Sequence, residues 1–237
     1  MSEDRCLEAS IELNRYISSQ LIPHLTSRNG LAPRIYAFAA LARCNRLLSG
    51  MIELHQAGFQ DISRMNLRPI VECWFLGTYL LLEPDEAYGT LLALHKKQLG
   101  QMADNGWSNL TEVIEAIETE SGTPNWKAIA ARLEVLFAES SEAGLVTPMA
   151  VYNSIYRGES LLDIHGGIGV LQGHVDERDN ATFTIERRTG PAYDTSHTKP
   201  AAALIGLFAI MVTSRIAFGQ DELLRLHHQV LNCGAQT

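Results

Sequence analysis

The sequence predicts an all-α protein, a multi-helix bundle of about eight or nine helices. Apolar residues recur at the three- and four-residue spacing of helices along most of the chain, and Pro, Gly and Asn-Gly breaks divide it into segments of helical length. Only the stretch 174–197 departs from this pattern. Within it, 181–187 alternates and contains β-branched residues, which predicts a short strand or β-hairpin. We therefore expect one helical domain over 1–237, with 174–197 as a surface excursion.

The composition supports a large core and an acidic surface. Apolar residues make up 46% of the 237 residues, and the formal net charge is -8. This charge argues against broad nucleic-acid binding but allows a local basic pocket around Arg64 and Arg68. The polar start MSEDRCLEAS is unlike a signal peptide, and the most apolar run, 201–212, is too short to span a bilayer. We expect no membrane partner and a cytoplasmic location.

The helices are delimited by recognisable end signals. Pro23 and the polar residues after it close the first helix, and Gly58 is placed to cap the second. The alternating stretch is the only long interruption. The expected helices are 2–25, 33–57, 60–82, 85–104, 110–120, 125–138, one from 147 onward, 201–218 and 220–231.

Within 60–82, Pro69 predicts an irregularity. An interior proline costs about 3 kcal/mol and frees the carbonyl four residues earlier, here that of Met65. Either the helix kinks at Pro69, or a new helix begins there with Pro69 in its first turn. In both alternatives Arg68 stands at the irregularity.

Arg64, Arg68 and Glu72 recur every four residues on this apolar segment. Spacing of this kind brings an arginine and a glutamate together as an ion pair, which we expect to be buried here. Arg68 is a candidate to bind a phosphate or carboxylate while Glu72 orients it. The alternative is an ordinary structural ion pair.

The stretch 152–173 carries the densest reactive chemistry. Tyr152 and Tyr156 fall on one helical arc, and His165 on another. Because His165 precedes Gly166 and Gly167, it is a candidate general acid or base at a helix end, or a histidine that caps helix carbonyls. We expect His165 to meet the Arg68–Glu72 helix, with Tyr156 nearby. No cofactor motif is visible, and His174, Asp176 and Glu177 match no metal-ligand spacing.

The four cysteines are Cys6, Cys44, Cys73 and Cys233, and none belongs to a C-x-x-C pair. Their mostly apolar or helical context predicts reduced, mostly buried thiols, as is typical of a cytosolic protein.

Two motifs carry a family resemblance. R-P-I-V-E stands at 68–72, and Y-x-x-x-Y at 152–156 is followed by a serine and by H-G at 165–166. Together they resemble a bacterial family of helical domain-of-unknown-function proteins similar to the HEPN superfamily, over about residues 35–173. The resemblance implies a helical bundle, a homodimer and a bacterial defence or toxin setting. Many HEPN proteins are metal-independent ribonucleases with an Arg and His motif; here seven residues separate Arg157 from His165, a longer spacing than in that motif.

These observations lead to competing hypotheses. In the first, a HEPN-like pocket containing Arg68, Glu72, Arg157 and His165 binds an anionic group or cleaves RNA, with His165 as acid or base and an arginine stabilising phosphate charge. In the second, the protein is a non-catalytic interaction or sensing module whose buried Arg/Glu/His cluster is structural. A third is small-ligand binding near Gly166 and Gly167. The sequence leaves the reaction and the ligand open.

Overall fold

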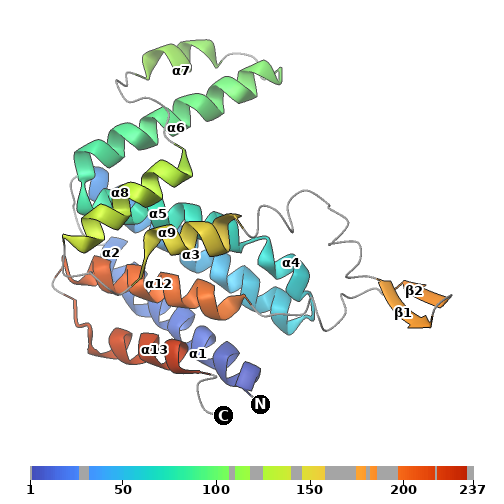
Figure 1. Cartoon of the computed structure of the whole chain (residues 1–237). Coiled ribbons are helices and arrows are strands. Elements are labelled where there is room, and N and C mark those ends of the chain that lie inside the picture. The colour runs from blue at the N-terminus through green and yellow to red at the C-terminus, as the bar shows by residue number, and fades with distance from the viewer. Residues whose placement is uncertain are drawn as a thin grey trace.

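The computed structural model describes residues 2–26, 32–106, 110–117, 125–139, 146–157, 175–179, 182–185, 197–216 and 218–233. Figure 1 shows an all-α multi-helix bundle, which confirms the predicted fold class. No described helix combines the length and the hydropathy needed to cross a membrane.

The first predicted helix is present but changes character along its length. It consists of α1 (Ser2–Tyr16), a π-helical turn η1 (Ile17–Leu21) and α2 (Ile22–Thr26). The helix continues past Pro23 and ends at Thr26, within one residue of the predicted end. Proline removes the bond to the carbonyl of Ser19 and crowds that carbonyl, and the wider π-helical turn directly before Pro23 accommodates this.

The helix α3 (Ala32–Gln56) follows the predicted range closely. Gly58 ends it as expected: its φ is 77°, and its N–H donates to the carbonyl of His55 at 2.9 Å. The positive φ explains why glycine suits this position.

The segment around Pro69 adopts the second of the two alternatives. α4 (Gln60–Arg64) ends before a turn at Met65 and Asn66, and α5 (Leu67–Leu82) begins with Pro69 in its first turn. The proline therefore stands where a missing N–H costs least. Arg68 is placed in the same first turn.

Most remaining elements lie within or close to their predicted ranges, but the helix predicted for 201–218 ends at Thr213. Asn125 caps one helix, because its side-chain oxygen accepts a hydrogen bond from the N–H of Ala128 at 2.9 Å. Two strands, β1 and β2, form an antiparallel hairpin, and β2 lies inside the segment predicted to be extended. The other residues of 174–196 lie outside the described ranges. The elements are α6 (Pro84–Asp104), α7 (Thr111–Ala116), α8 (Trp126–Ala138), α9 (Pro148–Val151), a second π-helical turn η2 (Tyr152–Tyr156), β1 (Val175–Asp179), β2 (Thr182–Ile185), α12 (Thr198–Thr213) and α13 (Asp221–Asn232).

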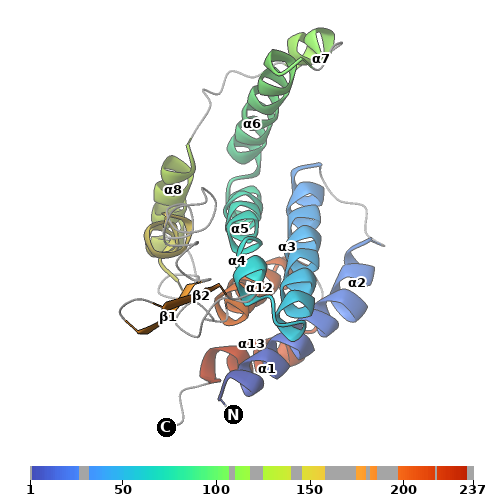
Figure 2. The same cartoon turned by 90° about the vertical axis from the view of Figure 1, so that its right-hand side faces the viewer.

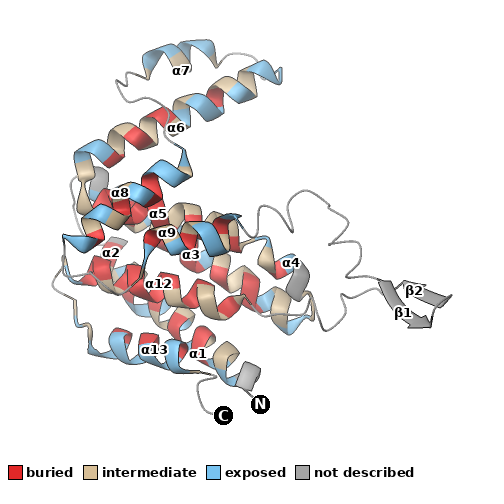
Figure 3. Cartoon of the chain, viewed as in Figure 1, coloured by how far each residue is buried: buried red, intermediate tan, exposed pale blue. Residues whose placement is uncertain are grey.

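The core lies between α3, α5 and α12, with α1 and α13 packed beside them. Figure 2 shows α6 and α7 extending beyond the other helices at one end, and Figure 3 shows buried faces concentrated on α5 and α12. Trp74, Phe75 and Phe208 are completely buried. α12 meets α5 so closely that a Cβ on Gly77 would collide with the ring of Phe208 and lie 3.0 Å from the Cβ of Ala40.

A polar network joins the N-terminal helix to α3. Asn45 is only 2% exposed, and its amide donates to the Ser18 hydroxyl at 2.8 Å and to the Asn14 carbonyl at 3.2 Å. The Asn14 amide donates in return to the Asn45 side chain at 3.0 Å, and the Ser49 hydroxyl donates to Asn14 Oδ1 at 3.1 Å. The bonds satisfy a buried asparagine beside the π-helical turn, so the network fixes the register between the helices.

A disulfide corrects one prediction about the cysteines. Cys6 in α1 is bonded to Cys233, which follows α13, with a Cα–Cα distance of 5.1 Å. The two chain ends lie at the same side of the bundle in both Figure 1 and Figure 2. The prediction of reduced thiols is therefore wrong for this pair, because helices from opposite ends of the sequence pack side by side. Cys44 is a buried free thiol and Cys73 a half-buried one.

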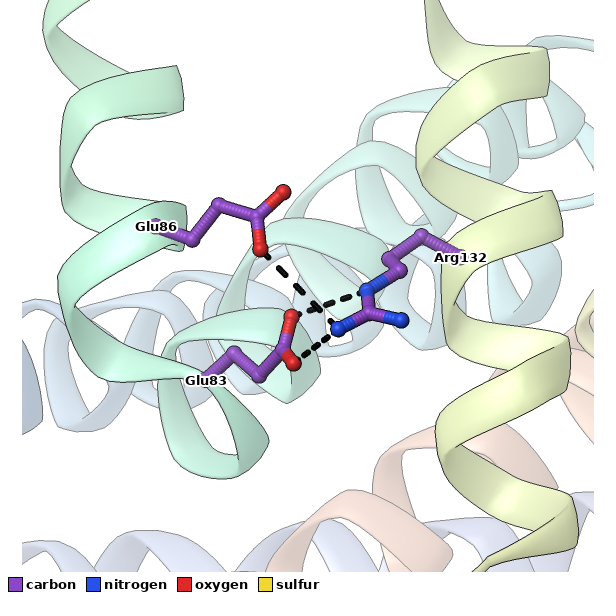
Figure 4. A network of polar contacts seen from close by, with 3 residues as sticks. All are labelled: Glu83, Glu86 and Arg132. Atoms are coloured by element: carbon purple, nitrogen blue, oxygen red, sulfur yellow. Dashed lines mark hydrogen bonds and ion pairs between the residues drawn. The ribbon is translucent and has the colours of Figure 1, made fainter.

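An arginine clamp fixes α8 to the junction of α5 and α6. Figure 4 shows Arg132 facing Glu83 and Glu86. Arg132 Nε donates to Glu83 at 2.9 Å, a second guanidinium nitrogen also contacts Glu83, and Glu86 lies 4.0 Å from the guanidinium. Such a bidentate pair holds a defined geometry, so it orients α8 against the start of α6.

Candidate functional site

A cavity of about 780 Å³ opens between α3, α5, α6 and α8. Its volume is in the range of small-molecule sites. Aromatic and leucine side chains form much of its wall, and charged groups stand among them. The lining residues are Tyr36, Arg43, Arg68, Pro69, Glu72, Cys73, Leu76, Tyr88, Leu91, Leu92, Leu94, His95, Lys97, Gln98, Gln101 and Trp126.

Arg68 is held in the wall by two partners. Its Nε donates to Glu72 Oε1 at 3.1 Å, one turn along α5, and a terminal nitrogen donates to the hydroxyl of Tyr156 at 2.9 Å. The guanidinium carbon also lies 4.8 Å from the centroid of the Tyr156 ring, a cation–π contact. The side chains of Arg68 and Glu72 are 28% and 29% exposed, so the pair is half-buried rather than buried as the sequence predicted.

Tyr156 reaches Arg68 because of the second π-helical turn and an aromatic cluster. Its ring stacks on that of Tyr152, with centroids 5.4 Å apart and an interplanar angle of 18°, and lies 6.3 Å from Trp126. Tyr156 is 8% exposed. The rings on two sides restrict its orientation, which keeps the hydroxyl aimed at the guanidinium.

The surroundings of Arg68 and Tyr156 determine the charge of each side chain. Burial by itself lowers the pKa of Arg68, but the hydrogen bond to Glu72 and the charge on that carboxylate outweigh it and raise the pKa. Burial, followed by the charge on Glu72, raises the pKa of Tyr156. Arg68 is therefore a permanent cation and Tyr156 a neutral phenol at physiological pH.

The cavity is positive although the chain is acidic. Among the described residues, Arg43, Arg68 and Lys97 line it against one carboxylate, that of Glu72, and His95 stands on the same wall. The chain as a whole carries a formal charge of -8. A cleft lined by one sign of charge concentrates ligands of the other sign, so this cavity favours an anion.

One thiol lines this wall and a second is buried behind it. Cys73 lines the cavity one residue after Glu72, and the buried thiol of Cys44, on α3, influences its pKa. Cys44 also points at the start of α5, because its Sγ lies 3.6 Å from the Ile70 carbonyl oxygen. The hydrogen bond from Cys44 lowers the pKa of Cys73, and Arg43 adds to this effect against the opposing influence of burial.

The structure brings together some of the candidate residues. Arg68, Glu72 and Tyr156 form one cluster. Arg64 ends α4, on the other side of the turn at Met65 and Asn66, so the helical stripe predicted to join it to Arg68 is interrupted. Arg157 directly follows Tyr156, and its side chain is exposed. His165, Gly166 and Gly167 lie outside the described residues, so the predicted contact between His165 and α5 stays a prediction.

Sequence reasoning missed most of the cavity wall. It named no candidate residue in the helix expected at 85–104, yet Tyr88, His95 and Lys97 on α6 line the cavity. The missed residues are ordinary helix-surface types in sequence. Their common location depends on how α6 leaves the bundle, and no local pattern reports that.

No family model, curated protein or solved structure matches the chain. Within the described ranges, no group of three or more His, Cys, Asp or Glu side chains is arranged to hold a metal ion. The site is accordingly interpreted from its own geometry.

Proposed function

We propose that this protein is a binding or sensing module for a small anionic ligand with an aromatic or apolar body. The observation that supports it is the positive, aromatic-lined cavity in an acidic chain. Arg68 lines the cavity, and Glu72 and Tyr156 hold its guanidinium in a fixed orientation there. A preoriented guanidinium suits a carboxylate, sulfonate or phosphate, because its planar donors match their oxygens.

The apolar part of the ligand would pack against the rest of the wall. Tyr36, Tyr88 and Trp126 supply aromatic surface, and Leu91 and Leu92 supply aliphatic surface. Apolar walls with a few placed polar groups are the usual composition of small-molecule sites. This proposal takes anion binding at Arg68 and Glu72 from the first hypothesis drawn from the sequence, and the non-catalytic sensing role from the second.

The test uses 8-anilinonaphthalene-1-sulfonate, an aromatic sulfonate whose fluorescence reports binding. Wild type is expected to bind it saturably. Arg68→Gln should weaken binding by about tenfold or more, because hydrogen bonds to charged groups contribute about 1.5–3 kcal/mol. Arg225→Gln is the matched control: Arg225 also pairs with a glutamate of its own helix, Glu222, but does not line the cavity.

A neutral analogue separates charge from apolar packing. N-phenyl-1-naphthylamine lacks the sulfonate and should bind wild type and Arg68→Gln alike. Thermal unfolding establishes that each variant is folded, and Arg68→Lys replaces Arg68→Gln if the latter is not. Equal affinity of the sulfonate for wild type, Arg68→Gln and Arg225→Gln would reject the proposal.

A second proposal follows the HEPN resemblance: a bacterial, cytoplasmic homodimer in a defence system that cleaves RNA. Its support is that Arg68, Glu72 and Tyr156 meet while exposed Arg157 directly follows Tyr156 in sequence. Cleavage of mixed RNA by wild type but not by His165→Ala or Arg157→Ala, with a dimer by light scattering, would support it. Equal background cleavage of RNA by all three proteins would reject this second proposal.

A further inference from the structure

Cys44 and Cys73 are the free cysteines of the chain, and they face each other across two packed helices. Cys44 belongs to α3 and Cys73 to α5, and each thiol influences the pKa of the other. The Cys44 sulfur also lies 3.6 Å from the carbonyl oxygen of Ile70, three residues before Cys73, which places it against the same turn of α5. Cys44 therefore points at the turn of α5 that leads to Cys73, an arrangement from which a disulfide between the two helices can form.

The two cysteines differ in exposure, as the separate roles of an attacking thiol and a resolving thiol require. Cys73 lines the open cavity and is half-buried, so part of this residue is accessible from the cavity. Cys44 is completely buried behind it. Arg43, the neighbour of Cys44 in sequence, lines the same cavity as Cys73, and its charge lowers the pKa of Cys73. A cation beside an accessible thiol favours its thiolate, which is the nucleophilic form.

We propose that Cys73 is a peroxide-reactive thiolate and that Cys44 resolves its oxidised form to an intramolecular disulfide. The inference does not depend on the proposed anionic ligand, since it uses the thiols and Arg43 alone. It also separates these cysteines from Cys6 and Cys233, which are already bonded to each other. The chain would then contain one structural and one reversible disulfide.

The steps balance with hydrogen peroxide as the oxidant. The Cys73 thiolate attacks one peroxide oxygen, the O–O bond breaks, and Cys73 becomes a sulfenic acid while hydroxide leaves and takes a proton to form water. Cys44 then loses its proton and attacks the Cys73 sulfur. The S–S bond forms, the S–O bond breaks, and the departing hydroxide combines with that proton as a second water.

The directions of the pKa shifts agree with these roles. The pKa of Cys73 is lowered, first by the hydrogen bond from Cys44 and then by Arg43, whereas burial raises that of Cys44 well above its ordinary value. Cys73 therefore carries the attacking thiolate. Cys44 keeps its proton until the sulfenic acid has formed next to it.

The experiment treats the folded full chain with hydrogen peroxide and maps the cysteines by mass spectrometry after alkylation and digestion. Wild type is expected to lose both free thiols and gain a Cys44–Cys73 crosslink. Cys73→Ser should keep Cys44 reduced. Cys44→Ala should accumulate a Cys73 sulfenic acid that dimedone traps. The Cys6–Cys233 peptide pair is the internal standard.

Arg43→Gln tests the cation, and Arg46→Gln is its control, because Arg46 is exposed on the same helix but does not line the cavity. Arg43→Gln should slow Cys73 oxidation about threefold, while Arg46→Gln should react like wild type. Circular dichroism establishes that the variants are folded.

Two results would overturn the assignment. One is survival of both thiols in wild type at peroxide concentrations that consume glutathione. The other is oxidation of Cys44 at the wild-type rate in Cys73→Ser. If Cys73 is oxidised at the same rate in Arg43→Gln and Arg46→Gln, Arg43 has no part in the mechanism.

Discussion

Arg68 contacts Tyr156 twice: its guanidinium donates to the phenol oxygen at 2.9 Å, and its central carbon lies 4.8 Å from the ring centroid. The two residues are 88 positions apart in sequence. Their contact joins the first turn of α5 to the π-helical turn η2. It is therefore both a packing contact between distant segments and the feature that positions a cation at the cavity wall.

Tyr156→Phe should lower the free energy of unfolding by about 1 kcal/mol, because it removes the hydrogen bond but keeps the ring and its cation–π contact. Urea unfolding measures this change. Tyr152→Phe is the control, since the Tyr152 ring stacks on Tyr156 and its hydroxyl makes no hydrogen bond within the described part of the chain. An equal loss in both variants would show that the bond between Arg68 and Tyr156 contributes nothing.

Glycine-to-alanine substitutions should have opposite effects in α5 and α6. At Gly77 the new methyl would collide with Phe208, so Gly77→Ala should destabilise the protein by about 1–3 kcal/mol. At Gly100, also helical, a Cβ meets nothing within 4 Å, so Gly100→Ala should stabilise by about 0.5–1 kcal/mol through helix propensity. Thermal unfolding of both variants checks the pair. Stabilisation by Gly77→Ala would contradict the close approach of α12 to α5.

His227 should make stability depend on pH. It is 8% exposed, its Nε2 lies 3.0 Å from the Ala203 carbonyl oxygen, and burial lowers its pKa. The unfolded chain, with a histidine pKa near 6.5, then binds more protons than the folded one. The contribution of His227 to the free energy of unfolding is therefore complete above about pH 6.5. It declines as the pH falls towards the lower pKa of the folded state.

Urea unfolding between pH 5 and 8, the range in which histidines titrate, would measure this dependence. His227→Gln should flatten the profile, whereas His228→Gln should change it far less, because burial is the main cause of the lowered His227 pKa and the charge on exposed His228 adds less. A profile that keeps its slope in His227→Gln would assign the titration elsewhere.

Loss of the Cys6–Cys233 disulfide should lower the free energy of unfolding by about 3–5 kcal/mol, because the bond closes a very long loop and restricts the unfolded chain. The separation is 227 residues. Cys6→Ser, Cys233→Ser and the double variant should lose equal amounts, measured by urea unfolding. A larger loss in the double variant than in either single one would show that the cysteines act separately.

Periodicity predicted the helices well, since their apolar faces and end signals are local. Pro69 marked the start of α5, and Gly58 the end of α3. How two distant segments align against each other is not determined by any local sequence pattern. The sequence therefore suggested Tyr156 as a neighbour of Arg68 but could not show the π-helical turn that aims it.

The failures have the same physical cause. Arg64 was grouped with Arg68 by an uninterrupted helical period, which the turn at Met65 and Asn66 breaks. The disulfide and the pairing of Cys44 with Cys73 depend on which helices pack together, and cysteine spacing carries no such information. The cavity depends on the direction in which α6 leaves the bundle.

The bond between Cys6 and Cys233 has a mechanical consequence. It turns residues 6–233 into a covalent ring, so tension applied to the chain outside this pair passes through the sulfur bridge and bypasses the helices between. Such pulling would leave the bundle unloaded until the bridge is reduced. A single backbone cut inside the ring would leave one covalent molecule, whereas after reduction the same cut would release two chains.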